Sequence, residues 1–487
     1  MSRDYNVVII GSGPAGFSCA MQSSKFDQKV LVIESHENYL GGTWINTGTV
    51  PSKALREAAK TILEFNNQFG DHENKKPYER FRMADLLQYK QEILEKENRK
   101  VKNDFINNNV DVARGFGRLK DEHTVEVETH LGTTETYTAD YILLCTGSSP
   151  TEPAVFEIEH NKILDYKSIL DLTHIPRRLV VIGSSVSAFE YATIFAALGT
   201  RITLLNEQED YLPFLDYEIK EHFQQAIYER GITIKNDISI QEVEFNALRN
   251  NTEVKFRSNT GEQQLQVIET EHVLHLGGRK PNVQNLNLHH VGVQTDDDDF
   301  IIVDEAYKTH ADSIYAAGDV IGFPRLASAS FTQGRLAACN MFNIPSLEMP
   351  EQIPYGIYTI PEISNIGMTE QEAERMDLDI TVGRAFFSEI TKADMTNHGD
   401  GLLKLIFHTE SLKLLGVHIL GDEAANLIHL GQSVIALDGD VRYFIQHVMN
   451  YPTLSEAYRI AAFNGVNRIY QKGAEYKHIL GDRGIED

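Results

Sequence analysis

Cysteine is scarce in this sequence, and its three copies stand far apart at Cys19, Cys145 and Cys339. The number is odd and no CxxC pair occurs, which argues against a disulfide framework and against a zinc site. Free thiols in such numbers are typical of a reducing compartment. We therefore expect a cytoplasmic protein without a structural metal.

Positive charge and long apolar runs are also in short supply. The 487 residues include 45 Lys and Arg against 70 Asp and Glu, a formal net charge of −25. Phosphate-rich partners need a basic surface, so nucleic acid and anionic membranes are not expected as partners. No run approaches the ~18 apolar residues of a membrane span, and the amino terminus lacks the pattern of a secretory signal.

What the sequence does contain is a repeated plan of strand, glycine-rich turn, helix and strand. Residues 6–34 follow this plan and end in Glu34, and residues 178–207 repeat it with Asn206 at the matching position. The first turn glycine precedes that position by 23 residues in both copies. Two matched βαβ units predict an α/β protein with two Rossmann-like nucleotide-binding domains.

The first turn, Gly11-Ser12-Gly13-Pro14-Ala15-Gly16, has the full dinucleotide fingerprint. Gly11 allows the tight turn, Gly13 lets a pyrophosphate approach the backbone, and Gly16 lets helix and strand pack closely. The helix that follows offers free N–H groups to phosphate, and Glu34 can accept the ribose hydroxyls of an adenosine. The combination predicts a dinucleotide site.

The run Gly41–Lys53, GGTWINTGTVPSK, resembles the signature GGTCxNxGCxPSK of the pyridine nucleotide-disulfide oxidoreductases. Other motifs of that family follow in order: Thr146-Gly147-Ser148, Gly278-Arg279-Lys280-Pro281-Asn282, Ala317-Gly318-Asp319-Val320 and Leu326-Ala327-Ser328. The resemblance implies bound FAD, with Gly42 and Thr43 in its site. It also places Asp319 on the ribityl chain and Ala327 near the pyrimidine edge of the flavin.

The same resemblance implies the domain plan. We expect an FAD-binding domain at 1–152 and 281–346, an NAD(P)-binding domain at 153–280, and a dimerisation domain at 347–470, followed by a polar tail at 471–487. Within the dimerisation domain, residues 402–407 and 414–420 read as antiparallel strands, and 424–437 and 454–470 as helices. The third domain is therefore of α+β type, and a homodimer or higher homo-oligomer is expected.

The chain departs from the family at the residues that carry its chemistry. Trp44 and Thr49 occupy both redox-cysteine positions, so no dithiol can form there. The family's C-terminal His–Glu dyad is also changed, because Tyr451 replaces the His while Glu456 is kept. The stretches Asn450–Arg459 and Gly356–Ser364 are similar to the soluble pyridine nucleotide transhydrogenases, a subgroup of this family with related substitutions.

The resemblance then implies a hydride relay between NAD(H) and NADP(H). Lys53 is expected near flavin N5, paired with Glu190, where the pair favours charge on the reduced flavin; a buried ion pair that only joins two domains is the competing interpretation. Trp44, the single tryptophan, either fills a gap in a loop or stacks on the flavin.

The nicotinamide nucleotide is expected at the second turn, Gly183-Ser184-Ser185-Val186-Ser187-Ala188. Ala188 is tolerated, but Ser185 adds bulk where a pyrophosphate approaches. Asn206 neither holds two ribose hydroxyls as an acid does nor repels a 2′-phosphate, which suits an enzyme of both nicotinamides. The acidic run 207–210 disfavours NADPH unless a distant cation, with Arg201 and Arg178 nearest in the chain, lies beside it.

Transhydrogenation is the first hypothesis. The second is a diaphorase or NADH oxidase that passes electrons to a quinone, a dye or oxygen. The third is a flavin-bound redox sensor or scaffold that works through its surface, which the altered second turn keeps open.

Overall fold

The computed structural model of the chain describes residues 3–69, 82–159, 161–261 and 264–472, and it divides into two compact units. The first unit comprises residues 1–55, 83–173 and 277–350, and the second comprises residues 56–82, 174–276 and 351–487. The expected FAD-binding domain lies in the first unit, apart from residues 56–69 and 82, which cluster with the second. The expected NAD(P)-binding and dimerisation domains share the second unit, except that residues 153–173, 277–280 and 347–350 cluster with the first.

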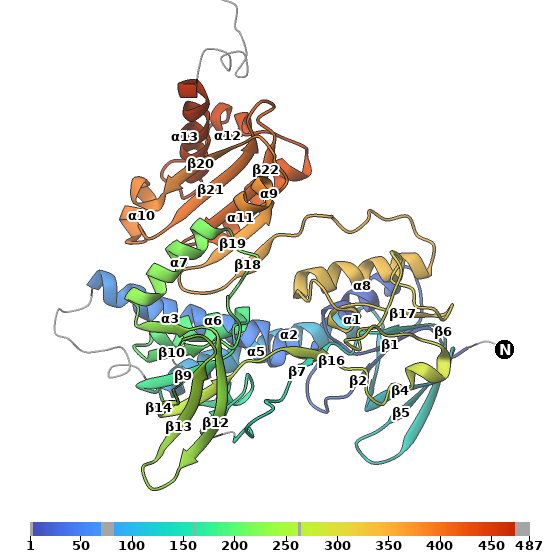
Figure 1. Ribbon diagram of the computed structural model, residues 1–487. Helices are drawn as coiled ribbons and strands as arrows, with labels where there is room; N and C mark the ends of the chain where they lie inside the picture. Colours follow the sequence, from blue (N-terminus) through green and yellow to red (C-terminus); the bar gives the residue numbers. More distant parts are fainter. Residues whose placement is uncertain (1–2, 70–81, 160, 262–263, 473–487) are drawn as a thin grey trace, which may run out of the picture. The chain divides into compact units, whose positions relative to one another are not determined.

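The first unit is built on a parallel sheet in which β1 lies between β2 and β6, with β17 on the far side of β6. The apolar runs at 7–10 and 30–33 are buried because helices cover the sheet. Helices α1 and α8 lie side by side (Figure 1), so closely that a Cβ on Gly334 would overlap the Ala15 carbonyl. The elements are β1 (Tyr5–Ile10), α1 (Pro14–Ser24), β2 (Val30–Glu34), α2 (Gly42–Asn46), α3 (Thr49–Phe69, continuing into the second unit), α5 (Met83–Asn107), β3 (Asp111–Arg114), β4 (Phe116–Asp121), β5 (Thr124–Glu128), β6 (Thr134–Leu144), β7 (Ser148–Pro150), β8 (Ile163–Leu164), β16 (Arg279–Pro281), β17 (Ile314–Ala316) and α8 (Ala327–Met341).

The second unit begins with a second parallel sheet, in the order β11-β10-β9-β15, and an antiparallel sheet of β12, β13 and β14. The central strand β9 lies between β10 and β15, as β1 lies between β2 and β6 in the first unit. The two predicted Rossmann-like folds are therefore confirmed. The elements are β9 (Arg178–Ile182), α6 (Val186–Ala197), β10 (Arg201–Leu205), α7 (Tyr217–Glu229), β11 (Ile232–Lys235), β12 (Ile238–Asn246), β13 (Asn251–Ser258), β14 (Gln266–Thr270) and β15 (His272–His275).

The C-terminal part of the second unit is an antiparallel sheet in the order β18-β19-β22-β21-β20, packed with helices. The two predicted strands are β21 and β22, in register at Leu405 and Val417, and the predicted helices are α11 and α13. The α+β class of the third domain is thus confirmed. The elements are β18 (Tyr355–Ile357), β19 (Ile363–Gly367), α9 (Glu370–Arg375), β20 (Ile380–Phe386), α10 (Thr391–Thr396), β21 (Leu402–His408), β22 (Leu414–Leu420), α11 (Ala424–Ala436), α12 (Arg442–Gln446) and α13 (Glu456–Lys472).

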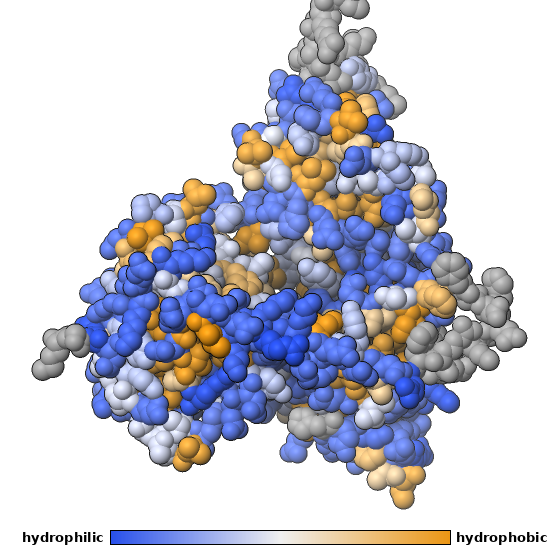
Figure 2. Space-filling view, turned by 180° about the vertical axis from the view of Figure 1, so that it is seen from behind, coloured by the Kyte–Doolittle hydropathy of each residue, from blue (hydrophilic) through white to orange (hydrophobic). Residues whose placement is uncertain are grey.

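Hydrophobic residues remain on the surface of this C-terminal part (Figure 2). Its exposed apolar side chains include Leu437, Val448 and Tyr451, of which Val448 is fully exposed. The predicted polar tail falls, from residue 473 onward, outside the described residues. Among the residues that are described, no helix combines the length and the apolarity needed to cross a membrane.

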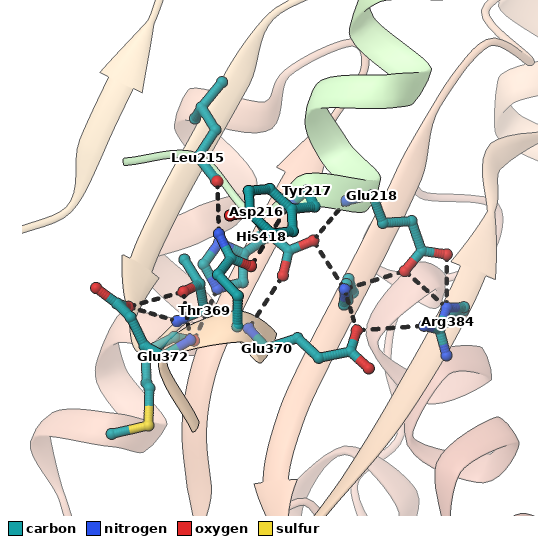
Figure 3. Close-up of polar contacts among 12 residues, drawn as sticks. Leu215, Asp216, Tyr217, Glu218, Thr369, Glu370, Glu372, Arg384 and His418 are labelled. Atoms are coloured by element: carbon teal, nitrogen blue, oxygen red, sulfur yellow. Dashed lines mark hydrogen bonds and ion pairs between the residues drawn. The ribbon is translucent and has the colours of Figure 1, made fainter. Parts of the chain in front are cut away.

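A buried ion-pair network ties α7 to the C-terminal sheet (Figure 3). The ammonium of Lys404, on β21, is 1% exposed and lies 2.7 Å from Asp216, which is fully buried. It also lies 3.0 Å from Glu218 and 2.5 Å from Glu370. Burial opposes a charge here, but the carboxylates raise the pKa of Lys404. The network is one electrostatic unit shared by both halves of the second unit.

Candidate functional site

The carboxyl ends of four parallel strands carry the motifs of the first unit. Gly11 follows β1, Glu34 ends β2, Thr146 comes shortly after β6, and Gly318 comes shortly after β17. Because β1 lies between β2 and β6, this edge is the point where the strand order reverses. Ligands of open α/β sheets bind at such a point.

The turn after β1 has the geometry that its glycines predict. Gly11 has a φ of +109°, and a Cβ there would overlap the Cys145 carbonyl. A Cβ on Gly13, by contrast, would meet nothing within 4 Å. Gly13 is the N-cap of α1 and supplies no side-chain cap, and Pro14 and Ala15 form the first helical positions. The open space and the uncapped helix N-terminus fit a phosphate group.

Glu34 is buried at this edge and is held by its neighbours. The amides of Ser12 and His36 donate to its carboxylate at 3.3 and 2.9 Å, and the Ser12 hydroxyl also contacts it. The same hydroxyl accepts the Gly41 amide at 2.9 Å, which joins the fingerprint turn to the loop before α2. Sequence reasoning missed this contact of Ser12, because Ser12 stands at a variable position of the fingerprint.

Asp319 lies at the end of a polar chain. The Ser148 hydroxyl donates to its Oδ2 at 2.7 Å, and Arg279 donates to the hydroxyl and the carbonyl of Ser148 at 2.8 and 2.6 Å. Burial lowers the pKa of Arg279, and the charge of Asp319 opposes that effect. Ser148 and Arg279 therefore orient the carboxylate that is expected at the ribityl chain.

The motifs around Thr146 and Gly278 bind each other. The Thr146 hydroxyl donates to the Asn282 carbonyl at 2.7 Å, and the Asn282 side chain donates to the Thr146 carbonyl at 2.8 Å. The Asn282 amide donates to the Gly147 carbonyl, and the Gly278 carbonyl accepts from Thr151. In this structure these residues connect β7 to β16, so they shape the edge of the site.

Trp44 is half-buried and packs in an aromatic cluster. Its ring lies 4.9 Å from Phe331 at an angle of 82°, and 6.0 Å from Phe17. These edge contacts support the interpretation that Trp44 fills a gap. Gly42 and Thr43 precede it on α2, whereas Thr49 is exposed at the first position of α3.

Helix α8 begins at Ala327 with Leu326 as its N-cap, which makes no side-chain cap. The Gly318 amide donates to the side chain of Gln333 on the same helix at 2.8 Å. Both α1 and α8 thus offer uncapped amides to a negatively charged group. Together with Glu34 and Asp319, these helix ends fit a flavin dinucleotide.

The second turn differs from the first because the helix that follows it, α6, has a side-chain N-cap, whereas α1 has none. Gly183 keeps a φ of +129°, but the Ser185 hydroxyl donates to the Leu276 carbonyl at 3.2 Å and accepts the Ala188 amide at 3.4 Å. Ser185 is therefore the N-cap of α6. Its side chain folds back toward its own helix rather than outward into the space where a pyrophosphate approaches.

Asn206 is fully buried and holds its own loop. Its Nδ2 donates to the Asp210 carbonyl at 3.1 Å and to Asn236 at 3.0 Å, while its Oδ1 accepts the Gln208 amide at 3.0 Å. Both amide hydrogens are thus used within the protein. In this geometry the Asn206 side chain orders its own loop, and its contact with a ribose stays a prediction.

The cations that lie near the loop after Asn206 in space are not the ones nearest to it in sequence. Arg201 and Arg178 pair at the amino ends of β10 and β9, at the opposite end of the strands from Asn206. Lys220 instead contacts the Asp210 carboxylate, and Lys235 ends β11 in register with Leu205. These two lysines come from segments that sequence reasoning did not connect with the loop.

Lys53 and Glu190 belong to different units. Lys53 lies half-buried on α3 in the first unit. Glu190 lies on α6 in the second, where it is 5% exposed and accepts the Tyr358 amide at 3.0 Å. The pairing of the two side chains stays a prediction.

The two C-terminal residues do not form a dyad. Tyr451 is 67% exposed and its hydroxyl lies 2.9 Å from the Thr391 hydroxyl. Glu456 is buried and accepts from Arg459 at 3.1 Å. The carboxylate that would serve a histidine in the resembling family is here paired with an arginine of its own helix.

Comparison with known proteins agrees with this geometry. The family profile described as pyridine nucleotide-disulphide oxidoreductase matches residues 5–334, and the profile of the dimerisation domain of that family matches residues 353–462. The soluble pyridine nucleotide transhydrogenase of Marinomonas sp. (strain MWYL1) is 38% identical over 474 residues, which cover 96% of this chain and 100% of that protein. The one from Pseudomonas aeruginosa (strain LESB58) is 38% identical over 470 residues, covering 96% and 99%. The solved structure of the HOCl-induced flavoprotein disulfide reductase RclA from Escherichia coli is alike in fold, with a TM-score of 0.84 and 23% identity over 94% of this chain and 99% of that one.

Proposed function

The chain belongs to the pyridine nucleotide-disulphide oxidoreductase family, and from this premise we propose that it transfers hydride between NAD(H) and NADP(H) through a bound FAD, without a redox disulfide. The proposal rests on one observation: Trp44 and Thr49 occupy the two positions at which the family has redox cysteines. Trp44 is packed against Phe331, and Thr49 opens a helix, while the flavin motifs around them are intact. The curated relatives named above are soluble pyridine nucleotide transhydrogenases.

The residues that would hold FAD are those at the strand ends of the first unit. The N-terminus of α1 at Gly13 would receive the pyrophosphate, Glu34 the adenosine ribose, and Asp319 the ribityl hydroxyls. The N-terminus of α8 would face the flavin pyrimidine. When bound, FAD supplies a centre that accepts and returns two electrons as hydride.

Lys53 and Glu190 are the proposed catalytic pair. A lysine ammonium near flavin N5 stabilises negative charge on the reduced ring, and a carboxylate beside it keeps the ammonium in place. Tyr358 contributes by donating its amide to Glu190. Without a redox thiol, no residue has to serve as its base. The hydrogen bond from Arg459 to the Glu456 carboxylate agrees with this.

The nicotinamide nucleotides are proposed to bind the second fold, one after the other. Gly183 supplies the tight turn, and the amides of Val186 and Ser187, at the start of α6 before the capped Ala188, would face the phosphate. We further propose a homodimer formed through residues after about 346, and a location in the cytoplasm.

Anaerobic stopped-flow mixing tests the proposed function. FAD-loaded protein is reduced with NADH or NADPH, and the reduced protein is then mixed with each oxidised nucleotide, with a quinone or with oxygen. Fast reoxidation by a nicotinamide is expected. Reoxidation only by quinone or oxygen would identify a diaphorase or oxidase, and the absence of any reduction would leave a sensor or scaffold.

Lys53→Met tests the catalytic pair in the same assay. The substitution should slow flavin reduction by ~10²-fold or more while FAD stays bound, because it removes the preorganised charge at N5. Lys60→Met, two turns later on α3, is the matched control and should reduce at the wild-type rate. An unchanged rate in Lys53→Met would make the pair a structural link only.

A further inference from the structure

The segment Tyr358–Glu362, here called the strap, is bound from its main chain by two helices of the second unit. Arg56, on α3, donates from Nε and Nη2 to the Thr359 carbonyl at 3.3 and 3.1 Å. On the other side, the amides of Tyr358 and Ile360 donate to the side chains of Glu190 and Thr193, on α6, at 3.0 and 3.2 Å. The strap therefore connects α3 to α6 through hydrogen bonds of its main chain.

A buried ion pair fixes the C-terminal end of the strap at Glu362. Nη2 of Arg56 lies 2.8 Å from the carboxylate of Glu362, and the two side chains are only 3% and 9% exposed. The second oxygen of Glu362 accepts the Ala425 amide at 3.1 Å, in the first turn of α11. Burial raises the pKa of Glu362, and the charge of Arg56 opposes that rise. Arg56 thus favours the ionised carboxylate, which the contacts with Arg56 and Ala425 fix against two helices.

Arg56 lies close to one member of the proposed catalytic pair in the chain and is connected to the other through the strap. Arg56 follows Lys53 by three residues, so both side chains project from the same stretch of α3. The strap that Arg56 holds is the one whose Tyr358 amide binds the Glu190 carboxylate. A hydrogen bond from a rigid amide fixes one carboxylate oxygen, and a shift of about 1 Å in such a group costs up to 10²-fold in rate.

We infer that Arg56 is a positioning residue for hydride transfer: it holds the strap so that the Tyr358 amide fixes the orientation of the Glu190 carboxylate. The inference rests on the proposed function, since it assumes that Glu190 assists flavin reduction. Arg56 itself need not touch FAD or nicotinamide. Its effect on the rate should pass entirely through Glu190.

A double-mutant cycle separates this role from a structural one. Flavin reduction by NADH and the flavin midpoint potential are measured for wild type, Arg56→Met, Glu190→Gln and the double variant. Arg56→Met is expected to slow reduction roughly 10-fold or more in the wild-type background. It should have no further effect when Glu190 is already Gln. It should also shift the midpoint potential in the same direction as Glu190→Gln does.

Two further variants keep the test decisive. Lys60→Met, one turn beyond Arg56, removes an α3 cation that is paired with Asp422, and it should leave rate and potential unchanged. If Arg56→Met does not fold with FAD, Glu362→Gln replaces it in the cycle, because it removes the charge that holds Arg56 while keeping the volume. Equal slowing in both Glu190 backgrounds would overturn the inference, as would a rate loss in Lys60→Met as large as in Arg56→Met.

The proposed function and the inference fail in different ways. If neither nicotinamide reduces wild-type flavin, the proposed function is wrong. If Glu190→Gln is as fast as wild type, the catalytic role of Glu190 is wrong and the inference about Arg56 falls with it, while the proposed function stands. If Glu190→Gln slows reduction but Arg56→Met does not, the pair stands and only the role of Arg56 is overturned.

Discussion

Single substitutions at the two nucleotide sites have different structural effects. At the first site, Trp44 exchanges a redox-active sulfur for an aromatic ring held by Phe331. At the second site, Ser185 exchanges an open glycine for a hydroxyl that caps α6. The first change removes an electron carrier, and the second satisfies an amide that the intact fingerprint leaves for phosphate.

Reductive titration follows from the first change. The protein should take up about two electrons per subunit, because flavin is the only redox centre, whereas a dithiol enzyme takes about four. The remaining cysteines cannot substitute, since all three are buried and burial raises the pKa of Cys19 to about 12. Anaerobic dithionite titration measures the uptake, and Cys19→Ala should give the same number. An uptake of four electrons would contradict a disulfide-free mechanism.

Nicotinamide preference follows from the loop after Asn206. Asp210 is paired with Lys220, while Glu207 and Glu209 are exposed, so the loop stays negative. A 2′-phosphate should therefore bind more weakly, by about 1–2 kcal/mol or roughly 5–30-fold. The ratio of second-order rate constants for flavin reduction by NADH and NADPH at low salt measures this effect.

Glu207→Arg should move that ratio toward NADPH. Glu244→Arg, an equal charge change at an exposed position of β12, is the control and should leave the ratio as it is. A wild-type preference for NADPH would mean that a cation such as Lys235 reaches the 2′ group. A ratio that does not respond to Glu207→Arg would mean that position 207 faces elsewhere.

At the scale of elements, the second unit is held together by charge as well as by apolar packing. The network around Lys404 joins α7 to β21, and a second cluster joins α3 to the loops after α10 and β22. In both, a cation stands among carboxylates from separate elements. In the network around Lys404, whose pair with Asp216 is buried, the loss of one partner is costly.

Lys404→Met should therefore destabilise the protein strongly. Removing the ammonium leaves the fully buried Asp216 carboxylate without its cation, and the expected cost is about 3–5 kcal/mol. The midpoint of urea unfolding measures the change. Lys413→Met is the matched control, because its partner Asp438 is exposed and such pairs contribute about 0.2–1 kcal/mol. Equal shifts in the two variants would argue against the network.

The cluster of Glu64, His398 and Asp422 predicts a dependence of stability on pH. Both ring nitrogens of His398 lie 3.2 Å from a carboxylate, and Lys60 also contacts Asp422, so two cations face two acids. The neighbouring Asp422 carboxylate raises the pKa of His398. The stabilisation is therefore full below the unfolded value of about 6.5 and is lost as pH rises through the folded pKa.

His398→Gln should lower stability by about 1 kcal/mol at pH 6 and by less at pH 9. Urea unfolding of wild type and variant across this range measures the difference, with His130→Gln at an exposed turn as the control. A difference that stays constant or grows with pH would show that His398 does not act as a cation here.

At the scale of the whole molecule, the chain carries a match to a dimerisation domain and an apolar surface on the same part. Residues 353–462 match that domain, and Leu437, Val448 and Tyr451 are exposed within it. Large exposed apolar side chains in one region mark protein–protein contact. Homo-oligomerisation through this part follows from the match.

Light scattering should therefore give twice the chain mass of 55.0 kDa. Val448→Glu should shift the equilibrium toward monomer, because it adds a charge to the exposed apolar surface proposed as the interface. Leu248→Glu, at an equally exposed apolar position outside the matched domain, is the control and should leave the mass unchanged. A fully active monomer would contradict the proposed dimer.

The sequence alone determined the folds and the cofactor edge. Strand, turn and helix follow from residues close together in the chain, so the fingerprint at Gly11–Gly16, the acid at Glu34 and the loss of both redox cysteines could be read directly. The α+β strands at 402–407 and 414–420 followed from apolar runs in the same way. These features depend on local backbone geometry and on residue type.

Only the tertiary structure decided what several polar side chains do. Ser185 caps α6 and reaches Leu276, Asn206 is buried against Asn236, and Arg56 binds the strap some 300 residues away. The sequence interpretation took the first two as nucleotide ligands and gave Arg56 no role. A buried hydrogen-bonding group must find a partner, and packing of distant segments supplies it. No local pattern in the chain encodes which partner that will be.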